Sequence, residues 1–386
     1  MNVIGLISGT SVDGIDAALV EIKGSGFEIS AQLLASETYA YEPDLRQQIL
    51  AASAGEPLSM AGFAQLDDAI ATAFAQAAQT LQANTLSADL IASHGQTVFH
   101  RPPQGEQATV QALAYSVQLG RGAAIAHLTQ LPTVSNFRSA DIAAGGQGAP
   151  LVSAIDACLL SHPKHVRCVQ NLGGIGNVTY LPSLQSQGVE GEMLGVFGWD
   201  TGPANSLIDL AVHHFSQGQQ HYDRDGLWAA QGTPCQPLLH QWLRHPYFHQ
   251  PPPKSTGREL FGWDYWQQCL IDLQAYALSP ADSLATLSQL TVMSIVQNYT
   301  DFLPQLPDEV LLCGGGSRNH YLRQQLQQCL APISVLTTDE VGLCAEAKEA
   351  IAFAVLGFWR YHGVPSNLPS VTGARRRLVL GELYRP

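Results

Sequence analysis

The chain has 386 residues and a formal net charge of −13, and its composition is that of a globular protein, 46% hydrophobic and 13% charged. This length exceeds what one ordinary hydrophobic core organises, so we expect two domains. An acidic chain repels phosphate backbones at long range, which argues against nucleic acid as a partner.

The first half of the chain is predicted to open with a strand, a turn and a second strand. Residues 2–7 form an apolar run, a polar turn interrupts it, and residues 15–22 are apolar again. Apolar side chains at steps of three and four predict a helix over residues 58–81. Further along we expect strands over 89–92 and 117–119 and a helix over 120–129.

The second half begins with another strand–turn–strand unit, "VRCVQNLGGIGNVTYLP", which resembles the first in form. The stretch "GWDTGPANSLIDLAVHHF" is predicted to be a loop that becomes a helix, with Pro203 in the first helical turn. Leu207, Leu210 and Ala211 would form the buried stripe of that helix. The remaining expected elements are a loop over 245–254, helices over 284–302, 318–330 and 345–361, and strands over 309–313 and 333–336.

Strands and helices alternate along the chain, which predicts the α/β class. Because the two hairpins are similar and far apart in the sequence, we expect two domains of related build. The first would cover residues 1–164, with the tail 362–386 packing back on it, and the second would cover residues 165–361.

Three glycine-rich turns follow predicted buried strands, at residues 9–14, 173–176 and 314–316. Glycine allows positive φ and lets backbone N–H groups approach an anion closely. One such turn by itself is better explained as a plain hairpin. Three of them favour a nucleotide site, because a nucleotide presents several groups to hold.

Other nucleotide and hydrolase motifs do not fit. Ile15 follows Gly14 where a Walker A loop needs lysine, and "CGGGSRN" lacks the GxGxxG spacing of a Rossmann site. The chain has no GxSxG elbow and no HExxH pair. The seven cysteines are odd in number and lack CxxC spacing, which predicts thiols in a reducing compartment rather than disulfides or zinc.

Three carboxylates near these turns are candidates for chemistry. Asp13 could hold magnesium beside phosphates, or could only stabilise its own turn, and Asp16 begins the next strand and could be structural. Asp200 could be a helix N-cap or a general base. Gly202 would let a ligand approach, and Trp199 would exclude water or stack on a sugar, so we favour the base.

The motifs together resemble those of the anhydro-N-acetylmuramic acid kinase family. They are "GLISGTSVDGID", "SHGQTVFH", "SNFRSADIAAGGQGAP", "NLGGIGNVTYL", "WDTGPANSLID" and "LLCGGGSRN". They occur in the family's order between about residues 3 and 355, and the combination of GTSxDGxD, HGQTxxH and DTGPxN is highly specific. One departure is Ile7, where the family more often has methionine.

The resemblance implies a two-domain actin-like ATPase (ribonuclease H-like) fold, in which each domain is a mixed sheet flanked by helices and nucleotide binds in a cleft between them. It implies that the first domain holds sugar and phosphate and the second holds the nucleotide. It also implies ATP, Mg²⁺, a homodimer, and the conversion of 1,6-anhydro-N-acetylmuramic acid to N-acetylmuramic acid 6-phosphate in peptidoglycan recycling.

The implied chemistry needs one carboxylate. In the anhydro sugar O6 is bonded to C1, so water must attack C1 while a base takes its proton. O6 then attacks the γ-phosphorus, and the phosphoryl group replaces the general acid of ordinary glycoside hydrolysis. Asp200, in "DTGPAN", matches the family's catalytic base.

The resemblance also implies binding residues. Those expected to bind ATP are Gly9, Thr10, Ser11, Val12, Asp13, Gly14, Ile15, Asp16, Gly173, Gly174, Gly176, Asn177, Gly314, Gly315, Gly316 and Arg318, with Asp13 on the metal. Those expected to bind the sugar are His94, Gln96, Thr97, Asn136, Arg138 and Asp141. Arg138 would meet the lactyl carboxylate, or would form a buried ion pair with Asp141 instead.

Two alternatives remain open, and a third is excluded. A plain sugar kinase of the same fold would phosphorylate a free hydroxyl, and a nucleotide-gated chaperone or filament subunit would release phosphate without a phosphosugar. A sugar-sensing repressor would need a basic helix-turn-helix segment, which we do not find. Without a signal peptide or a run of about 18 apolar residues, we expect a cytoplasmic protein with no membrane partner.

Overall fold

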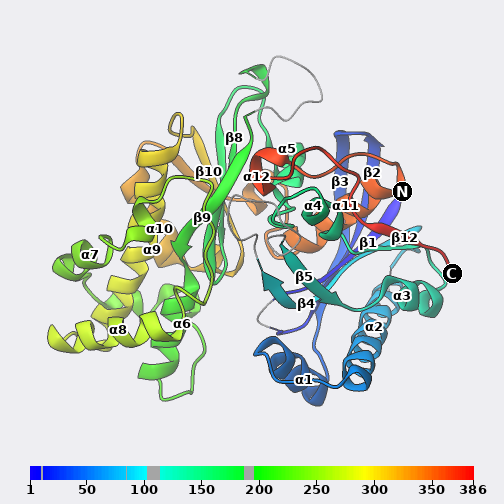
Figure 1. Ribbon diagram of the computed structural model, residues 1–386. Coiled ribbons are helices and arrows are strands. Elements are labelled where there is room, and N and C mark those ends of the chain that lie inside the picture. Colours follow the sequence, from blue (N-terminus) through cyan, green and yellow to red (C-terminus); the bar gives the residue numbers. More distant parts are fainter. Residues whose placement is uncertain (10–11, 84, 102–113, 187–194) are drawn as a thin grey trace. The chain divides into compact units, whose positions relative to one another are not determined.

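The computed structural model describes residues 1–9, 12–83, 85–101, 114–186 and 195–386, and the chain divides into two compact units (Figure 1). Unit 1 comprises the described residues of 1–159 together with 347–386, and unit 2 those of 160–346. Each unit contains a sheet with helices, so the predicted α/β class is confirmed.

Unit 1 is built on a sheet with the strand order β12-β6-β4-β1-β2-β3, and β5 pairs with β4. β1 runs parallel to β4 and antiparallel to β2, so the sheet is mixed. The strands are β1 (Asn2–Ser8), β2 (Ile15–Ser25), β3 (Glu28–Tyr39), β4 (Leu90–Arg101), β5 (Tyr115–Leu119), β6 (Thr133–Ser135) and β12 (Glu382–Tyr384). The helices are α1 (Pro43–Ser53), α2 (Met60–Ala83), α3 (Gly122–Thr129), α4 (Ser139–Ala143), α5 (Ser153–Leu160), α11 (Lys348–Tyr361) and α12 (Pro369–Thr372).

Two helices cover opposite faces of this sheet. Ile4 and Leu6 of β1 share a core with Phe74 of α2, and alternation along the strand turns Gly5 toward the other face. There α11 packs so closely that a Cβ on Gly5 would lie 1.8 Å from the carbonyl oxygen of Ala350. Only glycine fits between this strand and this helix.

Unit 2 is built on a sheet with the strand order β11-β10-β7-β8-β9, in which β10 runs parallel to β7 and β11 while β7, β8 and β9 are antiparallel. The strands are β7 (Arg167–Leu172), β8 (Ile175–Leu181), β9 (Phe197–Pro203), β10 (Glu309–Cys313) and β11 (Ser334–Thr337). The helices are α6 (Asn205–Phe215), α7 (Gln236–Trp242), α8 (Trp263–Ala275), α9 (Pro280–Phe302) and α10 (His320–Leu330).

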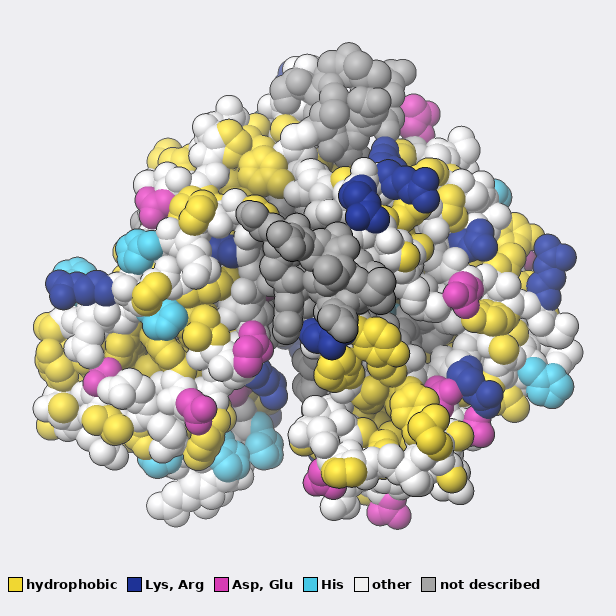
Figure 2. All heavy atoms as spheres, in the orientation of Figure 1, with side chains coloured by type: hydrophobic (Ala, Val, Ile, Leu, Met, Phe, Trp, Pro, Cys, Tyr) yellow, Lys and Arg dark blue, Asp and Glu magenta, His cyan; other side chains and the backbone are white. Residues whose placement is uncertain are grey.

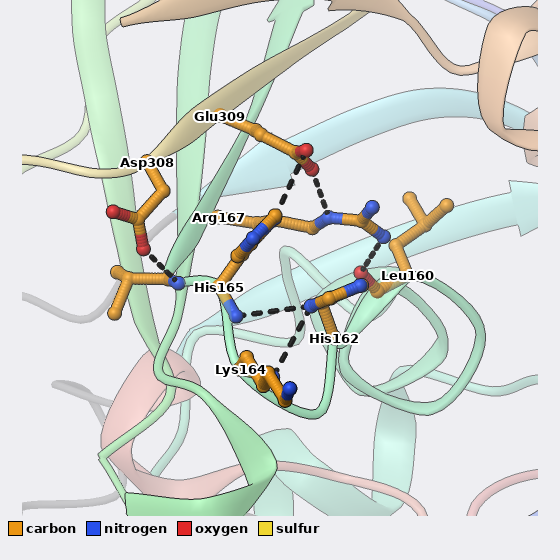
Figure 3. A network of polar contacts seen from close by, with 8 residues as sticks. Leu160, His162, Lys164, His165, Arg167, Asp308 and Glu309 are labelled. Carbon is orange, nitrogen blue, oxygen red and sulfur yellow. Dashed lines mark hydrogen bonds and ion pairs between the residues drawn. The ribbon is translucent and has the colours of Figure 1, made fainter.

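A polar network aligns the starts of β7 and β10 (Figure 3). Glu309 accepts from Arg167 Nε at 2.8 Å and contacts His165 Nδ1 at 3.0 Å. Asp308 accepts from the amide of Val166 at 2.8 Å. Because Glu309 and Arg167 are register partners in the parallel pair, these bonds fix the alignment of the two strands.

Most predicted elements are confirmed, but two expectations are wrong. Residues 197–203 form strand β9 rather than a loop, so Pro203 ends a strand, and α6 begins at Asn205. The helix expected over 345–361 is α11, and it packs on β1, β2 and β4 of unit 1 rather than joining the second domain. The division at residue 164 lies near the observed change of unit after Leu159.

Surface features agree with the composition. Arg375 and Arg376, in the basic run after α12, are exposed, as expected of a surface turn. Acidic and basic side chains are scattered over the face that Figure 2 shows. Among the described residues no helix is long and apolar enough to cross a membrane.

Candidate functional site

The first glycine turn joins β1 to β2 in unit 1. Val12 adopts a positive φ of 56°, and its amide donates to the carbonyl oxygen of Gly9 at 3.2 Å. Gln96 of β4 donates to the same oxygen at 3.2 Å, so a neighbouring strand holds the turn. Thr10 and Ser11, both predicted to bind ATP, lie outside the described residues.

The two acids of this turn have different surroundings. Asp13 is exposed, with Arg46 Nη2 at 3.5 Å, and Arg46 also donates to the carbonyl of Val12 at 2.9 Å. Asp16 is half-buried and accepts from Thr38 Oγ1 at 2.6 Å. Burial raises the pKa of Asp16, the Thr38 hydrogen bond opposes this rise, and the charge of Asp13 adds to it. Asp13 is therefore the accessible carboxylate and Asp16 the one bound to protein.

The surroundings of Asp13 can be compared with the ligands that Mg²⁺ prefers. Mg²⁺ is usually held through one or two carboxylates together with waters and substrate phosphates. The described residues contain no group of three or more His, Cys, Asp or Glu placed to hold a metal ion. An exposed carboxylate such as Asp13, beside a glycine turn, fits a site that the phosphates of the substrate complete.

Two of the residues predicted to bind sugar form a pair in unit 1. His94 is buried, and its Nδ1 lies 3.0 Å from the carbonyl of Gly95 while Nε2 accepts from Arg138 Nε at 3.1 Å. These contacts require a neutral imidazole protonated on Nδ1. Burial, with the charge of Arg138 adding to it, lowers the pKa of His94. Burial lowers the pKa of Arg138 to about 10, and Glu349 opposes this, so Arg138 is charged at neutral pH.

The other residues predicted to bind sugar contact protein. Gln96 is fully buried and supports the first glycine turn, and Thr97 Oγ1 accepts from Gln118 at 3.2 Å. Asn136 has a positive φ of 56° and donates to Glu382 at 2.9 Å. Gln96 and Thr97 therefore lie in the middle of β4, and Asn136 contacts β12.

Asp141 has a different environment from the one predicted. It is fully buried, and its oxygens accept from Asn367, Thr372 and the amide of Gly148 at 2.7–2.9 Å. A carboxylate enclosed in this way cannot reach a ligand without rearrangement, and it does not pair with Arg138, which bonds His94 instead. We interpret Asp141 as structural support for the loop after α4.

In unit 2 the third glycine turn packs against the end of β7, just before the second turn. A Cβ on Gly314 would lie 2.2 Å from Asn171 Oδ1, and one on Gly316 would lie 2.7 Å from the Cβ of Leu172. Gly315, between them, is exposed and has no heavy atom within 4 Å of the position its Cβ would take. The close contacts fix the third turn against β7 and leave Gly315 open to a ligand.

The start of α6 binds the carbonyls of the second turn. The amide of Asn205 donates to Gly173, and those of Ala204 and Ser206 donate to Gly174, each at 3.0 Å. Carbonyl oxygens would repel a phosphate, and here they are already occupied by the helix. This arrangement suits the binding of an anion at the second turn.

Two further residues predicted to bind ATP have protein partners. Arg318 forms an ion pair with Glu346, and both side chains are exposed. Asn177 of β8 is the register partner of Asp200 of β9, and a Cβ on Gly176 would lie 2.8 Å from Thr201 Oγ1. The second turn and the candidate base therefore lie on adjacent strands.

Asp200 lies within strand β9, so the interpretation of this residue as a helix N-cap is wrong. The amide of Thr256 donates to its Oδ2 at 2.9 Å. Burial raises the pKa of Asp200 to about 6, the Thr256 amide opposes the rise, and Glu259 adds to it. Trp199, the preceding residue, points into the core and donates to Asn298 at 2.9 Å, so it does not offer a sugar platform. At neutral pH the Asp200 carboxylate is ionised and can accept a proton.

The segment that contains Thr256 contacts Asp200, and this contact was not predicted from the sequence. This segment, in the proline-rich stretch after α7, has no hydrophobic periodicity and carries no recognised motif. The only signal was a lysine followed by Ser-Thr-Gly within a loop, which is too common to assign a role.

These features define an α/β protein of two units, with glycine turns at strand ends in both units and a carboxylate suited to proton transfer. A family model described as "Anhydro-N-acetylmuramic acid kinase" matches residues 1–386, and the chain belongs to this family.

The relatives agree with this membership. Proteins named anhydro-N-acetylmuramic acid kinase from Acaryochloris marina and Cyanothece sp. are 64% and 62% identical to this chain. The alignments cover 100% of this chain in both cases and 100% and 99% of the two relatives.

Solved structures are more distant. A ROK family glucokinase from Streptomyces griseus, in complex with glucose and AMPPNP, is 12% identical in sequence to this chain and has a TM-score of 0.39. The superposition covers 93% of this chain and 99% of the glucokinase. The activator of 2-hydroxyisocaproyl-CoA dehydratase from Clostridium difficile, with bound ADPNP, is 10% identical, with a TM-score of 0.44 and coverage of 93% and 94%.

Proposed function

We propose that this protein uses ATP to open the 1,6-anhydro ring of 1,6-anhydro-N-acetylmuramic acid and to phosphorylate O6, giving N-acetylmuramic acid 6-phosphate and ADP. The observation that carries the proposal is Asp200, a half-buried carboxylate whose pKa is raised to about 6. The family membership supplies the substrate class, since relatives above 60% identity bear the kinase's name.

In this proposal Asp200 takes a proton from water as the water oxygen bonds to C1. The C1–O6 bond breaks, O6 keeps its electron pair and bonds to the γ-phosphorus, and ADP leaves. The glycine turns bind the phosphates through backbone N–H groups, and Asp13 would hold Mg²⁺, which neutralises phosphate charge when bound. Binding of the nucleotide between the two units stays a prediction.

Replacement of Asp200 tests its role as the base. Asp200→Asn should lower kcat by roughly 10²–10⁴-fold or more, the range expected for general base catalysis. The measurement is steady-state turnover, with circular dichroism to establish that the variant is folded. A folded variant that kept near wild-type turnover would show that another group takes the proton.

Isotopic labelling separates this reaction from that of a plain sugar kinase. In ¹⁸O water, ring opening places solvent oxygen at C1, whereas phosphorylation of a free hydroxyl leaves it out. Mass spectrometry of the product should therefore show one ¹⁸O per molecule. An unlabelled phosphosugar would identify a plain kinase, and phosphate release without phosphosugar would identify a nucleotide-gated protein.

Arg138 is our candidate for binding the lactyl carboxylate. Its Nε donates to His94, and no bond to its terminal nitrogens is found among the described residues, so these remain for an anion. Arg138→Ala should raise KM much more for the lactyl sugar than for an anhydro-glucosamine analogue, which lacks the carboxylate. Equal losses on the two sugars would indicate a structural role.

We also propose the assembly, location and partners of the protein. Composition and the family resemblance favour a homodimer, a cytoplasmic location, and the absence of nucleic-acid and membrane partners. Size-exclusion chromatography with light scattering would measure the first directly.

A further inference from the structure

One segment of unit 2, residues 245–259, surrounds Asp200; we call it the Asp200 loop. The amide of Asp200 donates to the carbonyl of Lys254 at 3.2 Å, and its carbonyl accepts from the Tyr247 hydroxyl at 2.7 Å. The Thr256 amide donates to its carboxylate at 2.9 Å. The backbone N–H, the carbonyl and the carboxylate of Asp200 are thus all held by this one loop. The loop lies beside β9, which is an edge strand of its sheet.

The Asp200 loop is itself anchored by an unusual lysine. Lys254 is 9% exposed, and its Nζ donates to the carbonyl of Tyr247 at 3.3 Å. The same ammonium lies 4.6 Å from the centre of the Phe302 ring and 5.0 Å from that of Tyr247. A lysine so enclosed fixes both ends of the loop segment that contacts Asp200.

The Thr256 side chain is the feature of this loop that points to a ligand. Its Oγ1 is buried and has no hydrogen-bond partner among the described residues. A buried hydroxyl without a partner destabilises the folded protein. A buried hydroxyl of this kind, beside a reactive carboxylate, can find its hydrogen-bond partner in a ligand or an ordered water.

We propose that the Thr256 hydroxyl binds the water molecule that Asp200 deprotonates, and this inference rests on the proposed function of Asp200. The Thr256 amide already occupies Oδ2, and no bond to Oδ1 is found among the described residues. One hydrogen of the water would go to Oδ1 and the other would be donated to Thr256 Oγ1.

This arrangement directs a lone pair of the water toward C1. As that oxygen bonds to C1, its proton moves to Asp200 and the C1–O6 electrons stay on O6. The Thr256 proton does not move, so the hydroxyl orients the nucleophile and takes no part in acid–base exchange. Thr256 would thus be a catalytic residue that contacts a reacting molecule.

The charged and titratable groups that influence Asp200 are its neighbours on the loop. Glu259 raises the pKa of Asp200, and the charges of Asp200 and Glu259 add to the rise that burial causes in the pKa of Tyr247. Burial lowers the pKa of Lys254 to about 8, and the charge of Asp301 opposes this. The backbone N–H of Thr256 supplies the interaction that lowers the pKa of Asp200. A change confined to the Thr256 side chain should leave this balance unaltered.

The test is Thr256→Val, which removes the hydroxyl but keeps the shape and the backbone N–H. We expect kcat to fall by about tenfold to a hundredfold, with KM for the anhydro sugar changing less than about threefold. The acid limb of the kcat profile should stay in place. Thermal denaturation of the ligand-free protein should show equal or greater stability, because an unpartnered buried hydroxyl is gone. Thr256→Ser should restore most of kcat.

Ser288→Ala is the matched control. Ser288, on α9 of the same unit, also buries a hydroxyl without a partner among the described residues. This variant should share the effect on stability and leave kcat unchanged. A loss of kcat in Thr256→Val alone would therefore be specific to the position beside Asp200.

The outcomes separate the two proposals. If Thr256→Val keeps kcat within about twofold while Asp200→Asn is inactive, the role of Thr256 is wrong and the base stands. If both variants stay active, Asp200 is not the base and the inference about Thr256 falls with it. If Thr256→Val shifts the acid limb of the profile, the side chain acts by positioning Asp200, which also overturns the proposal.

Discussion

The surroundings of Asp200 raise the pKa of its carboxyl group in two ways, through burial and through the negative charge of Glu259. Burial is the largest cause of its raised pKa, and the single amide that bonds it only moderates the effect. The neighbouring side chain, Trp199, points to the opposite face and is bonded in the core. Because successive side chains of a strand point to opposite faces, Trp199 packs in the core while Asp200, the next residue, is placed on the other face.

The raised pKa of Asp200 predicts the pH dependence of turnover. A base must be ionised, so kcat/KM, which reports ionisations of the free enzyme, should fall on the acid side with a midpoint near pH 6. Glu259→Gln should move this limb to lower pH, because the negative charge of Glu259 raises the pKa of Asp200. Glu259 is exposed, so the shift should be small and should shrink further in high salt. A limb that moved to higher pH in Glu259→Gln would contradict the assignment.

At the scale of elements, β9 shows why part of the site could not be predicted. Its sequence, with aspartate, glycine and proline in succession, has the composition of a loop. It is a strand because it pairs with β8 at the sheet edge, where Pro203 need not donate to a further strand. Pairing and the Asp200 loop are contacts between distant segments, which local propensity does not record.

The glycine turns were predictable because their cause is local. A buried strand, glycines and the start of another element are adjacent in the sequence, and the structure has turns at all three places among the described residues. Their use by phosphates stays a prediction. The structure adds that the third turn packs on Asn171 and Leu172 at the end of β7, which depends on the pairing of β10 with β7 in the sheet.

The contact of the third turn with Leu172 predicts unequal effects of alanine at two neighbouring positions. Gly316→Ala would bring a Cβ within 2.7 Å of the Cβ of Leu172 and 2.9 Å of its carbonyl oxygen. We expect a loss of about 1–3 kcal/mol in the free energy of unfolding, as for other overpacked sites. Gly315→Ala meets open space and should leave stability within about 0.5 kcal/mol.

Urea denaturation of both alanine variants measures this difference. The KM for ATP is the second readout, and it should rise in Gly315→Ala if a phosphate or nucleoside occupies the open side of the turn. Equal free energies of unfolding for the two variants would show that the third turn is not tightly packed against β7.

At the scale of the whole molecule, the chain returns to unit 1 after completing unit 2. Periodicity predicted the helix over 345–361, but nothing in that pattern tells which sheet a helix covers. The reason for its location is spatial: Gly5 on β1 lets the backbone of α11 approach, and Gly357 on α11 fits against the side chain of Ala92 on β4. A match between a glycine and a distant segment cannot be read from one sequence.

A buried ion pair secures the returning chain. Lys348, the first residue of α11, places its Nζ 2.8 Å and 3.0 Å from the two carboxylate oxygens of Asp156 on α5. Both side chains are less than 10% exposed, at 8% and 3%. The pair joins two segments of unit 1 that are almost two hundred residues apart in the sequence, which makes it a sensitive point in the fold.

Removal of the lysine charge should destabilise unit 1. Lys348→Met leaves a buried carboxylate without the ammonium that faces it, which costs about 3–5 kcal/mol in comparable cases. Chemical denaturation should show this loss, whereas Lys164→Met, at an exposed lysine, should be nearly neutral. The double variant Asp156→Leu with Lys348→Met should recover part of the stability. A single variant as stable as the control would show that the pair contributes little.

The division of unit 1 into two stretches of chain has a consequence for synthesis on the ribosome. The sheet strands β1, β2 and β4 are made early, but α11, which covers one of their faces, follows only after the whole of unit 2. At about 5–20 residues per second, the interval between residue 160 and residue 361 lasts about 10–40 s. Unit 2 can complete its core within that time, while an apolar sheet face in the nascent chain remains uncovered and open to chaperones.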